Sequence, residues 1–277
     1  MKKILALTLA LTMVLALCAC GGAKAPAATQ APVEAPAEAP AADSDLAYVQ
    51  GKGTLIVGIT DFAPMDYKDD SGEWIGFDAD MARAFAEYLG QDVEFIEIDW
   101  DNKILELDAG NIDAVWNGMT LTDEVLNSMD CGTPYCNNAQ VVVVNAAVAD
   151  QYQDVASLAG LKFAVEAGSA GEDAVIELGN EYNAVLTQAD ALMEVAAGTS
   201  DACIIDLLMA GAMIGEGTSY PELTYTVKLT TEEYGVGFKK GSGLAEKFND
   251  FYAKAYADGT VMEIAEKYGV QESIIAK

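Results

Sequence analysis

The segment NGMTLTDEV, residues 117–125, gathers polar groups of the kind that hold small molecules. It offers an asparagine amide, a glycine backbone and the hydroxyls of Thr120 and Thr122, but it contains no cation. The whole chain has no histidine and a single arginine, Arg83. A guanidinium usually clamps a bound carboxylate, because it donates two parallel hydrogen bonds. We therefore predict a small-molecule contact loop whose ligand is held without that clamp.

Strand and helix patterns alternate around this loop. A helix is predicted from Asp78, as its cap, to Gly90, as its stop, with apolar residues along one face. Strands are predicted at 54–59, 93–98 and 112–116, and a short helix at 103–110. This order predicts an α/β fold with mostly parallel sheets, because parallel strands need helical crossovers.

The stretch ILELDAGNIDAVWNG (104–118) is echoed without gaps by LMEVAAGTSDACIID (192–206). Both are interpreted as a helix, a tight Ala-Gly turn and a buried strand, although a chance match of so common a unit remains an alternative. Gly118 and Asp206 then fall at corresponding strand ends, one in each of two lobes. Ligands of open α/β sheets lie outside the carboxyl ends of strands, so two facing lobes predict a cleft.

Five stretches carry a resemblance to a known family: GFDADMARAFAEYLG, IDAVWNGMTLTDE, TPYCNNAQVVVV, VEAGSAGEDA and DACIID. With them the chain, from about Thr54 to Gly269, resembles the bacterial extracellular solute-binding proteins of the polar amino-acid class (family 3), which serve ABC importers. Ala79 departs from the motif, which usually has a larger aliphatic residue there.

The resemblance implies a two-lobed, periplasmic-binding-protein-like (Venus flytrap) fold with two crossover strands, placed near 140–145 and 232–238. A ligand would be trapped between the lobes on hinge closure. We expect lobe 1 to comprise 46–143 plus 235–277, and lobe 2 to comprise 144–234. The C-terminal helices, from about Gly243, would return to lobe 1.

The same resemblance implies the residues of the pocket. Phe62 matches an aromatic ring that stacks on the ligand, and Trp100 a second wall; the alternatives are a core phenylalanine and a tryptophan that shields the hinge. Asp206 matches the acid that pairs with an α-ammonium, although it could simply cap the following helix. The expected ligand-binding set is Phe62, Trp100, Asn117, Gly118, Thr120, Thr122, Glu166, Gly168, Ser169 and Asp206.

Val125 stands where the family pattern Thr-x-Thr-x-x-Arg places the carboxylate-clamping arginine. Arg83 cannot replace it, because it is expected at the surface of its helix. Glu166, beside the Gly168-Ser169 element, adds a negative charge. Either a cationic or zwitterionic ligand has its carboxylate held by neutral hydroxyl, amide and backbone donors, or the ligand has no free carboxylate, as in an amine or an amide.

The N-terminus predicts export and a lipid anchor. Lys2 and Lys3 precede an apolar run too short for a permanent span, so residues 1–19 are expected to be a signal peptide. The following LCACG resembles a bacterial lipobox, and Cys20 fits lipidation better than Cys18, which follows a bulky leucine. An ordinary signal peptide with a chance cysteine is the alternative. Residues 20–45, rich in Ala and Pro, are expected to form a disordered tether that carries the lipidated cysteine.

Charge and cysteine content limit the partners. The net charge is −29, and removal of residues 1–19, with two lysines and no acids, gives −29 − 2 = −31. That argues against nucleic acid or anionic membrane as partners, since both need basic patches. Cys131 and Cys136 could form a disulfide or stay as thiols. We expect no metal and no cofactor, since there is no histidine and no paired CxxC.

The leading hypothesis is an extracytoplasmic, lipid-anchored binding protein, not an enzyme. It would bind an amino acid or a related small nitrogenous solute, including a cationic one, and deliver it to ABC permease subunits with a cytoplasmic ATPase. The resemblance implies a monomer. One alternative is an enzyme on the same fold, similar to cyclohexadienyl dehydratases, with Glu166 as general acid; no nucleophile–base pair is visible in the sequence. The other is a ligand sensor or adhesin on the cell surface.

Overall fold

A computed structural model describes residues 43–277, so the predicted signal peptide, Cys20 and most of the predicted tether lie outside the described residues. The first element, α1 (Asp43–Lys52), begins at the C-terminal end of the range predicted as tether. Within residues 43–277, none of the helices is both long enough and apolar enough to span a bilayer.

The first sheet has the strand order β4-β1-β5-β13-β6, with β7 also paired to β13. β1 is parallel to β4 and β5, whereas β13 is antiparallel to β5. The strands are β1 (Thr54–Ile59), β4 (Asp92–Glu97), β5 (Ala114–Thr120), β6 (Asp130–Cys131), β7 (Cys136–Asn138) and β13 (Glu232–Phe238). A separate hairpin joins β2 (Tyr67–Lys68) to β3 (Trp74–Ile75).

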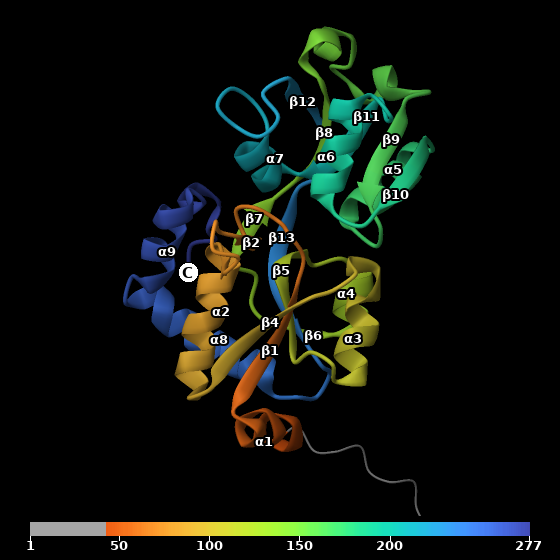
Figure 1. Cartoon of the computed structure of the whole chain (residues 1–277). Coiled ribbons are helices and arrows are strands. Elements are labelled where there is room, and N and C mark those ends of the chain that lie inside the picture. The colour runs from red at the N-terminus through yellow and green to blue at the C-terminus, as the bar shows by residue number, and fades with distance from the viewer. Residues whose placement is uncertain (1–42) are drawn as a thin grey trace, which may run out of the picture. The chain divides into compact units, whose positions relative to one another are not determined.

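Helices cover both faces of this sheet (Figure 1). On one side lie α2 (Phe77–Leu89), α8 (Leu244–Ala257) and α9 (Thr260–Tyr268), so the two C-terminal helices pack on the first sheet and on α2. On the other side lie α3 (Lys103–Ala109) and α4 (Asp123–Ser128). The α2 side holds an aromatic core, in which Phe85 contacts Trp116 and Phe248 at ring distances of 6.2 and 5.8 Å.

The second sheet has the order β10-β9-β11-β8-β12. β9 is parallel to β10 and β11, whereas β8 is antiparallel to β11 and β12. The elements are β8 (Gln140–Asn145), β9 (Lys162–Glu166), β10 (Glu181–Val185), β11 (Ala202–Asp206), β12 (Leu223–Lys228), α5 (Ala170–Leu178), α6 (Gln188–Ala197) and α7 (Leu207–Met213). Short 3-10 helices are η1 (Trp100–Asn102), η2 (Ala146–Gln151), η3 (Val155–Leu158) and η4 (Gln271–Ser273).

The chain passes between the sheets twice, at Ala139 between β7 and β8, and at residues 229–231 between β12 and β13. Each sheet therefore has three parallel strands followed by antiparallel ones. This confirms the α/β class, but the sheets are mixed and not mostly parallel. The predicted lobe limits after residues 143 and 234 stay a prediction.

Two local predictions were wrong. The helix predicted from Asp78 begins at Phe77 with Gly76 as its cap, and Asp78 makes no capping hydrogen bond, because its carboxylate bonds elsewhere in the core. The predicted contact loop is not a loop: β5 continues to Thr120 along β13, and α4 follows. Cys131, Cys136 and Cys203 are free thiols, so of the two alternatives left open for the first pair the structure has thiols.

Candidate ligand-binding site

One cavity of about 190 Å³ brings together residues from both sheets. All ten residues of the predicted ligand-binding set line it. They come from the turn after β1, from η1, from the end of β5, from the β9–α5 junction and from the end of β11. The carboxyl ends of β5, β9 and β11 therefore meet at this cavity, as expected for open α/β sheets.

Two aromatic residues stand in the cavity wall. Phe62 is only 3% exposed and meets the ring of Tyr234 edge-on, at 6.3 Å between centroids. It also lies against Gly118, where an added Cβ would come within 2.3 Å of its ring. Trp100 is 8% exposed and lines the cavity from η1. Gly118 has φ +54, a conformation that favours glycine, and so allows the close approach of the Phe62 ring.

The end of β5 is fixed by two buried acids. Asn117 donates to Asp66 Oδ2 (2.8 Å), and its Oδ1 accepts from the Thr60 backbone N–H (2.6 Å) and hydroxyl (2.7 Å). The Gly118 N–H donates to Asp78 Oδ2 at 2.6 Å. Burial is the main cause that raises the pKa of both Asp66 and Asp78 above their ordinary values. The amide of Asn117 is thus used within its own lobe, and positions the strand end.

The two threonines of the segment bind within the protein. The Thr120 hydroxyl donates to Glu232 Oε1 at 3.0 Å. Thr122 caps α4, because its Oγ1 accepts from the Val125 N–H at 3.2 Å. The side chain of Val125 is buried and also lines the cavity. The place of the expected arginine is therefore an apolar wall.

The Asp206 carboxylate accepts hydrogen bonds from the amides of Asn138 and Gln188 and from the Tyr234 hydroxyl (2.6 Å). It occupies the N-cap position of α7 but makes no side-chain capping bond, so its alternative role as a helix cap is not observed. Burial, and then the charge of Glu232, raise the pKa of Asp206. A buried acid held ready by three donors is suited to a bound cation.

Glu166 ends β9 and is 3% exposed. Its Oε1 has no hydrogen-bond partner among the described residues. Burial, followed by the charge of Asp206, raises the pKa of Glu166 to about 8. An unpartnered buried carboxyl is costly, and this one lines the cavity, where a ligand donor could satisfy it.

The β9–α5 junction supplies Gly168 and Ser169. Ser169 caps α5, because its Oγ accepts from the Glu172 N–H at 3.2 Å. The Gly168 N–H donates to Glu172 Oε2 at 2.7 Å, so a carboxylate of the protein already takes that donor. Gly168 has φ +70, and an added Cβ would come within 2.6 Å of the Asp101 Cα. The two lobes therefore approach closely at this point.

The sequence interpretation missed several cavity residues, of which Lys103 is the most consequential. It is 4% exposed and places a cation in a site for which the sequence indicated no certain cation. Gln188, which binds Asp206, was also missed. The available signal was the spacing WDNK, since a residue three positions after Trp100 returns to the same side of a helical turn. Further lining residues are Thr60, Asp101, Met119, Glu124, Ala170, Glu172 and Asp173.

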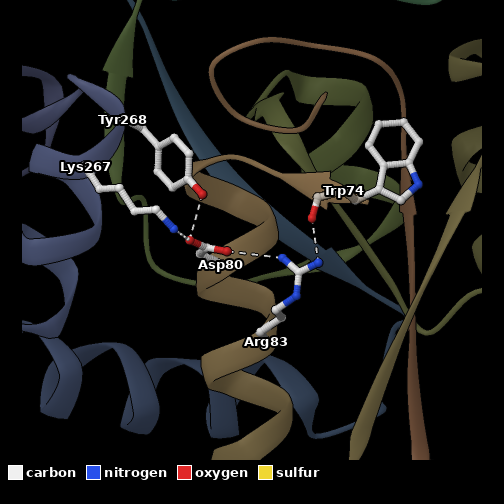
Figure 2. A network of polar contacts seen from close by, with 5 residues as sticks. All are labelled: Trp74, Asp80, Arg83, Lys267 and Tyr268. Atoms are coloured by element: carbon white, nitrogen blue, oxygen red, sulfur yellow. Dashed lines mark hydrogen bonds and ion pairs between the residues drawn. The ribbon is translucent and has the colours of Figure 1, made fainter. Parts of the chain in front are cut away.

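Arg83 lies outside the cavity, as predicted, and belongs to the polar network that Figure 2 shows. It donates to Asp80 Oδ1 at 3.1 Å and to the Trp74 carbonyl at 2.5 Å. Asp80 also accepts from Lys267 and Tyr268 of α9, so this network ties α9 to α2. The only guanidinium of the chain is therefore used to join elements of the first lobe.

Comparison with known proteins agrees with this geometry. The model of the bacterial extracellular solute-binding proteins, family 3, matches residues 55–271. The L-arginine-binding protein of Pseudomonas aeruginosa is 32% identical over 219 residues, which cover 75% of this chain and 84% of that protein. The L-cystine-binding protein TcyJ of Escherichia coli (strain K12) is 26% identical over 224 residues, covering 79% and 84%.

A solved structure with the same fold is the ancestral amino acid-binding protein AncCDT-1, a precursor of cyclohexadienyl dehydratase. It matches with a TM-score of 0.75 and 31% identity, covering 81% of this chain and 99% of that one. The family resemblance and the two-lobed fold predicted from the motifs are thereby confirmed.

Proposed function

Because this chain belongs to the bacterial extracellular solute-binding proteins, family 3, we propose that it captures an amino acid or a related small nitrogenous solute, including a cationic one, for an ABC importer. The convergence of all ten predicted residues on one cavity carries this proposal. At about 190 Å³ the cavity is smaller than the ~300–1,000 Å³ of sites for drug-sized ligands, which suits a small solute.

The two cavity acids support a ligand with a positive nitrogen. Asp206 and Glu166 both line the cavity and are buried. Burial raises the pKa of both carboxyls, and the charge of Asp206 raises the pKa of Glu166 further. Two like charges in a low dielectric are unfavourable, and an ammonium between them would relieve the repulsion. Trp100 and Phe62 provide aromatic faces that also attract a cation.

A thermal-shift screen of the purified full chain tests ligand capture. The probes are the twenty amino acids, L-cystine, polyamines and quaternary amines, with D-glucose as a control that has no nitrogen. A ligand at 100 times its Kd stabilises the folded state by about 2.7 kcal/mol, which raises the melting temperature measurably. The proposal would be contradicted if none of the nitrogenous probes raised the melting temperature, or if only glucose did.

Delivery to a permease is the second part of the proposal. ABC permease subunits with a cytoplasmic ATPase are the partners, and the binding protein acts as a monomer. The similarity to arginine- and glutamine-binding proteins of ABC transporters supports this part. Deletion of the gene should abolish high-affinity uptake of the radiolabelled ligand found in the screen, and restoring it should recover uptake. Unchanged uptake would favour a role as a sensor or adhesin.

The anchor is proposed from the sequence. Cys20 is the lipidation site after cleavage of residues 1–19, which places the protein outside the cytoplasmic membrane on the tether of residues 20–45. Cells grown with labelled palmitate should label the wild-type protein and a Cys18→Ser control, but not a Cys20→Ser variant. Equal labelling of all three forms, or of none, would contradict this assignment.

A second candidate function is enzymatic, and the buried Glu166 carboxyl is the observation that favours it. With a pKa raised to about 8 by burial, this group carries a proton at neutral pH and could serve as a general acid. Similarity to a precursor of cyclohexadienyl dehydratase gives the reaction to test. Release of phenylpyruvate from prephenate, lost in Glu166→Gln, would establish the enzyme; a ligand recovered chemically unchanged after incubation supports the binding protein.

A further inference from the structure

Lys103 is a buried cation without a counter-ion in the protein. It opens α3, and its side chain lines the cavity at 4% exposure. Its Nζ donates to the carbonyl oxygens of Gly168 (2.8 Å) and Trp100 (3.3 Å). None of the four ion pairs found among residues 43–277 includes Lys103. The charge is therefore held by two dipoles and by no carboxylate within 4 Å.

An ammonium group has three hydrogen-bond donors, and two carbonyls leave one of them without a protein partner. Burial lowers the pKa of Lys103, while nearby carboxylates, of which Glu124 and Glu166 act most strongly, favour its charged form. None of these carboxylates pairs with Lys103 directly, and a buried ammonium without a direct counter-ion is unfavourable unless a bound anion supplies one. An anion in the cavity would be held by the free donor and by the charge.

Several neutral donors of the site are already in use. The hydroxyls of Thr122 and Ser169 are not, since each only accepts a hydrogen bond, but they carry no charge, whereas Lys103 does. The Thr120 hydroxyl donates to Glu232, the Gly168 N–H to Glu172 and the Gly118 N–H to Asp78. Asn117 donates to Asp66 and to the Thr60 carbonyl. A carboxylate that took any of these donors would first have to displace a carboxylate or carbonyl of the protein. The free N–H of Lys103 requires no such exchange.

We propose that Lys103 binds the carboxylate of the ligand, in place of an arginine at position 125, and thereby restricts the ligands to solutes that carry both a carboxylate and an ammonium. The inference rests on the proposed function and names the ligand class of the same cavity. Lys103 faces the carboxylate, while Asp206 and Glu166 face the ammonium. Of the two classes that the sequence left open, this selects zwitterionic amino acids over carboxylate-free amines and amides.

The position of Lys103 also links this contact to closure. Its Nζ reaches from α3, in the first lobe, to the Gly168 carbonyl in the turn between β9 and α5, in the second. A ligand carboxylate on the same Nζ would neutralise the cation at the point where the lobes touch. Ligands with a carboxylate would therefore favour the closed form, because a ligand shifts a two-state equilibrium only by its difference in affinity for the two states.

Calorimetric titration of the purified full chain tests the preference. The probes are the twenty amino acids, the α-amide of each one that binds, and the pair L-arginine and agmatine, which differ only by the carboxylate. We expect the carboxylate-free probe to bind roughly 10- to 150-fold more weakly than its amino acid, the range of one charge-assisted hydrogen bond. Equal or tighter binding of agmatine or of the amide overturns the inference and leaves ligand capture intact.

Three variants assign the preference to the residue. Lys103→Met keeps the length and apolar stem of the side chain and should abolish the preference for the free carboxylate, whereas Lys103→Arg should keep it. Lys68→Met is the matched control, because Lys68 is an exposed lysine that pairs with Glu97 at 2.9 Å outside the cavity. Its preference should equal that of the wild type.

The ratio of the two dissociation constants separates recognition from a structural role. If Lys103→Met weakens amino acid and amide equally, Lys103 only supports the fold, and the inference is wrong. If none of the twenty amino acids and none of the amines binds the wild type, the proposed function fails, and the inference fails with it. A preserved preference in Lys103→Met also overturns it.

Discussion

The units α3–β5 and α6–β11 have the same turn between helix and strand in the two lobes but different chemistry at their ends. Each helix ends in a left-handed glycine, Gly110 with φ +75 and Gly198 with φ +74. After each glycine, the next residue donates its N–H to the carbonyl of a glutamate in the helix, at 3.0 Å in both units. The repeat in the sequence is therefore also a repeat of backbone hydrogen bonds.

The aspartate before each strand repeats the match. The carboxylate of Asp113 accepts from the Ile56 N–H at 2.7 Å, and that of Asp201 from the Lys162 N–H at 2.9 Å. Each aspartate also donates its own N–H to the carbonyl of the same partner, at 2.8 and 2.9 Å. Each unit is thus joined to the neighbouring parallel strand in the same way.

The cavity ends of the two units differ. Where the first strand has Gly118, the second has Asp206, and where α3 begins with Lys103, α6 has the buried Ala191. The first lobe thus contributes a cation and the second an acid, on matching frameworks. We infer from this difference that the residues shared by the two units stabilise them, whereas the residues that differ between the units bind the ligand.

Asp206→Asn should have the largest effect on ligand affinity, because it replaces the buried acid at the cavity end of the second unit. Loss of one member of a buried charge pair costs about 2–5 kcal/mol of binding free energy, so we expect at least a ~30-fold rise in Kd for a ligand ammonium. The melting temperature without ligand should stay close to that of the wild type, because the amide removes repulsion with Glu232 while it loses one acceptor. Calorimetric titration and thermal denaturation measure both.

Gly118→Ala, at the matching position, is the contrasting variant. Its added Cβ would meet the Phe62 ring at 2.3 Å on a backbone with φ +54, so stability should fall together with affinity. If Gly118→Ala lost affinity but kept its stability, or if Asp206→Asn lost stability but kept its affinity, the distinction between residues of the framework and residues of recognition would be wrong.

The free energy of unfolding should fall as pH rises toward neutrality, because of the buried Glu166 carboxyl. Burial raises the pKa of Glu166 from its ordinary 4.5 to about 8, so between these values the folded state binds more protons than the unfolded state. Stability therefore falls as pH rises from about 4.5 to 8, with a slope on the order of 1 kcal/mol per pH unit for one such group. Urea denaturation at several pH values measures it.

Glu166→Gln isolates the contribution of Glu166 in this experiment. It should reduce the slope, because the glutamine does not titrate, while the part due to Asp206 and to Asp66 and Asp78 of the first lobe remains. A saturating ligand with an ammonium should have the same effect as the variant, since it favours the ionised acids of the second lobe. Stability that rises with pH through this window would show that these acids are ionised in the folded protein.

Asp113→Ala and Asp201→Ala test the framework as a matched pair. Each removes the acceptor of one strand N–H. The bond to Asp113 is partly buried, and its loss should cost ~1–3 kcal/mol, whereas the bond to Asp201 is exposed and should contribute ~0.5–1.5 kcal/mol. Asp113 also pairs with Lys52, whose side chain is 20% exposed, so its replacement should cost slightly more. Denaturant unfolding measures both, and neither variant should change the ligand preference. A neutral effect of one variant beside a large effect of the other would show that the lobes are not built alike.

The sequence predicted the parts of the fold that are encoded locally. The glycine stops, the echo and the strands β1, β4 and β11 follow from residues within a few positions of each other. It did not predict that β5 continues through Asn117–Thr120, because the partner strand β13 lies more than a hundred residues away. Polar residues in that stretch indicated a loop, and only tertiary pairing makes them a strand.

The ten candidate site residues were chosen by matching family motifs, so cavity residues outside those motifs, such as Lys103, were not predicted. All ten residues lie at the cavity, but nothing in the sequence near Lys103 shows that its Nζ meets the Gly168 carbonyl of the other lobe. Of the expected ligand donors, the Thr120 hydroxyl is taken by the half-buried Glu232 and the Asn117 amide by the buried Asp66, and neither acid belongs to a motif. Long-range hydrogen bonds therefore decide which donors are free.

The smallest effect, and the strictest test of equivalence, is expected from Gly110→Ala and Gly198→Ala. Both glycines are in the left-handed region, and an added Cβ would meet no atom within 4 Å in either place. Only the backbone strain of an alanine remains, about 1–2 kcal/mol, so the two variants should lose equal stability. Denaturant midpoints with unchanged m-values measure the loss. If the two variants lost clearly different amounts of stability, one unit would have strain or contacts that the other lacks. The matching hydrogen bonds would then not imply matching energies.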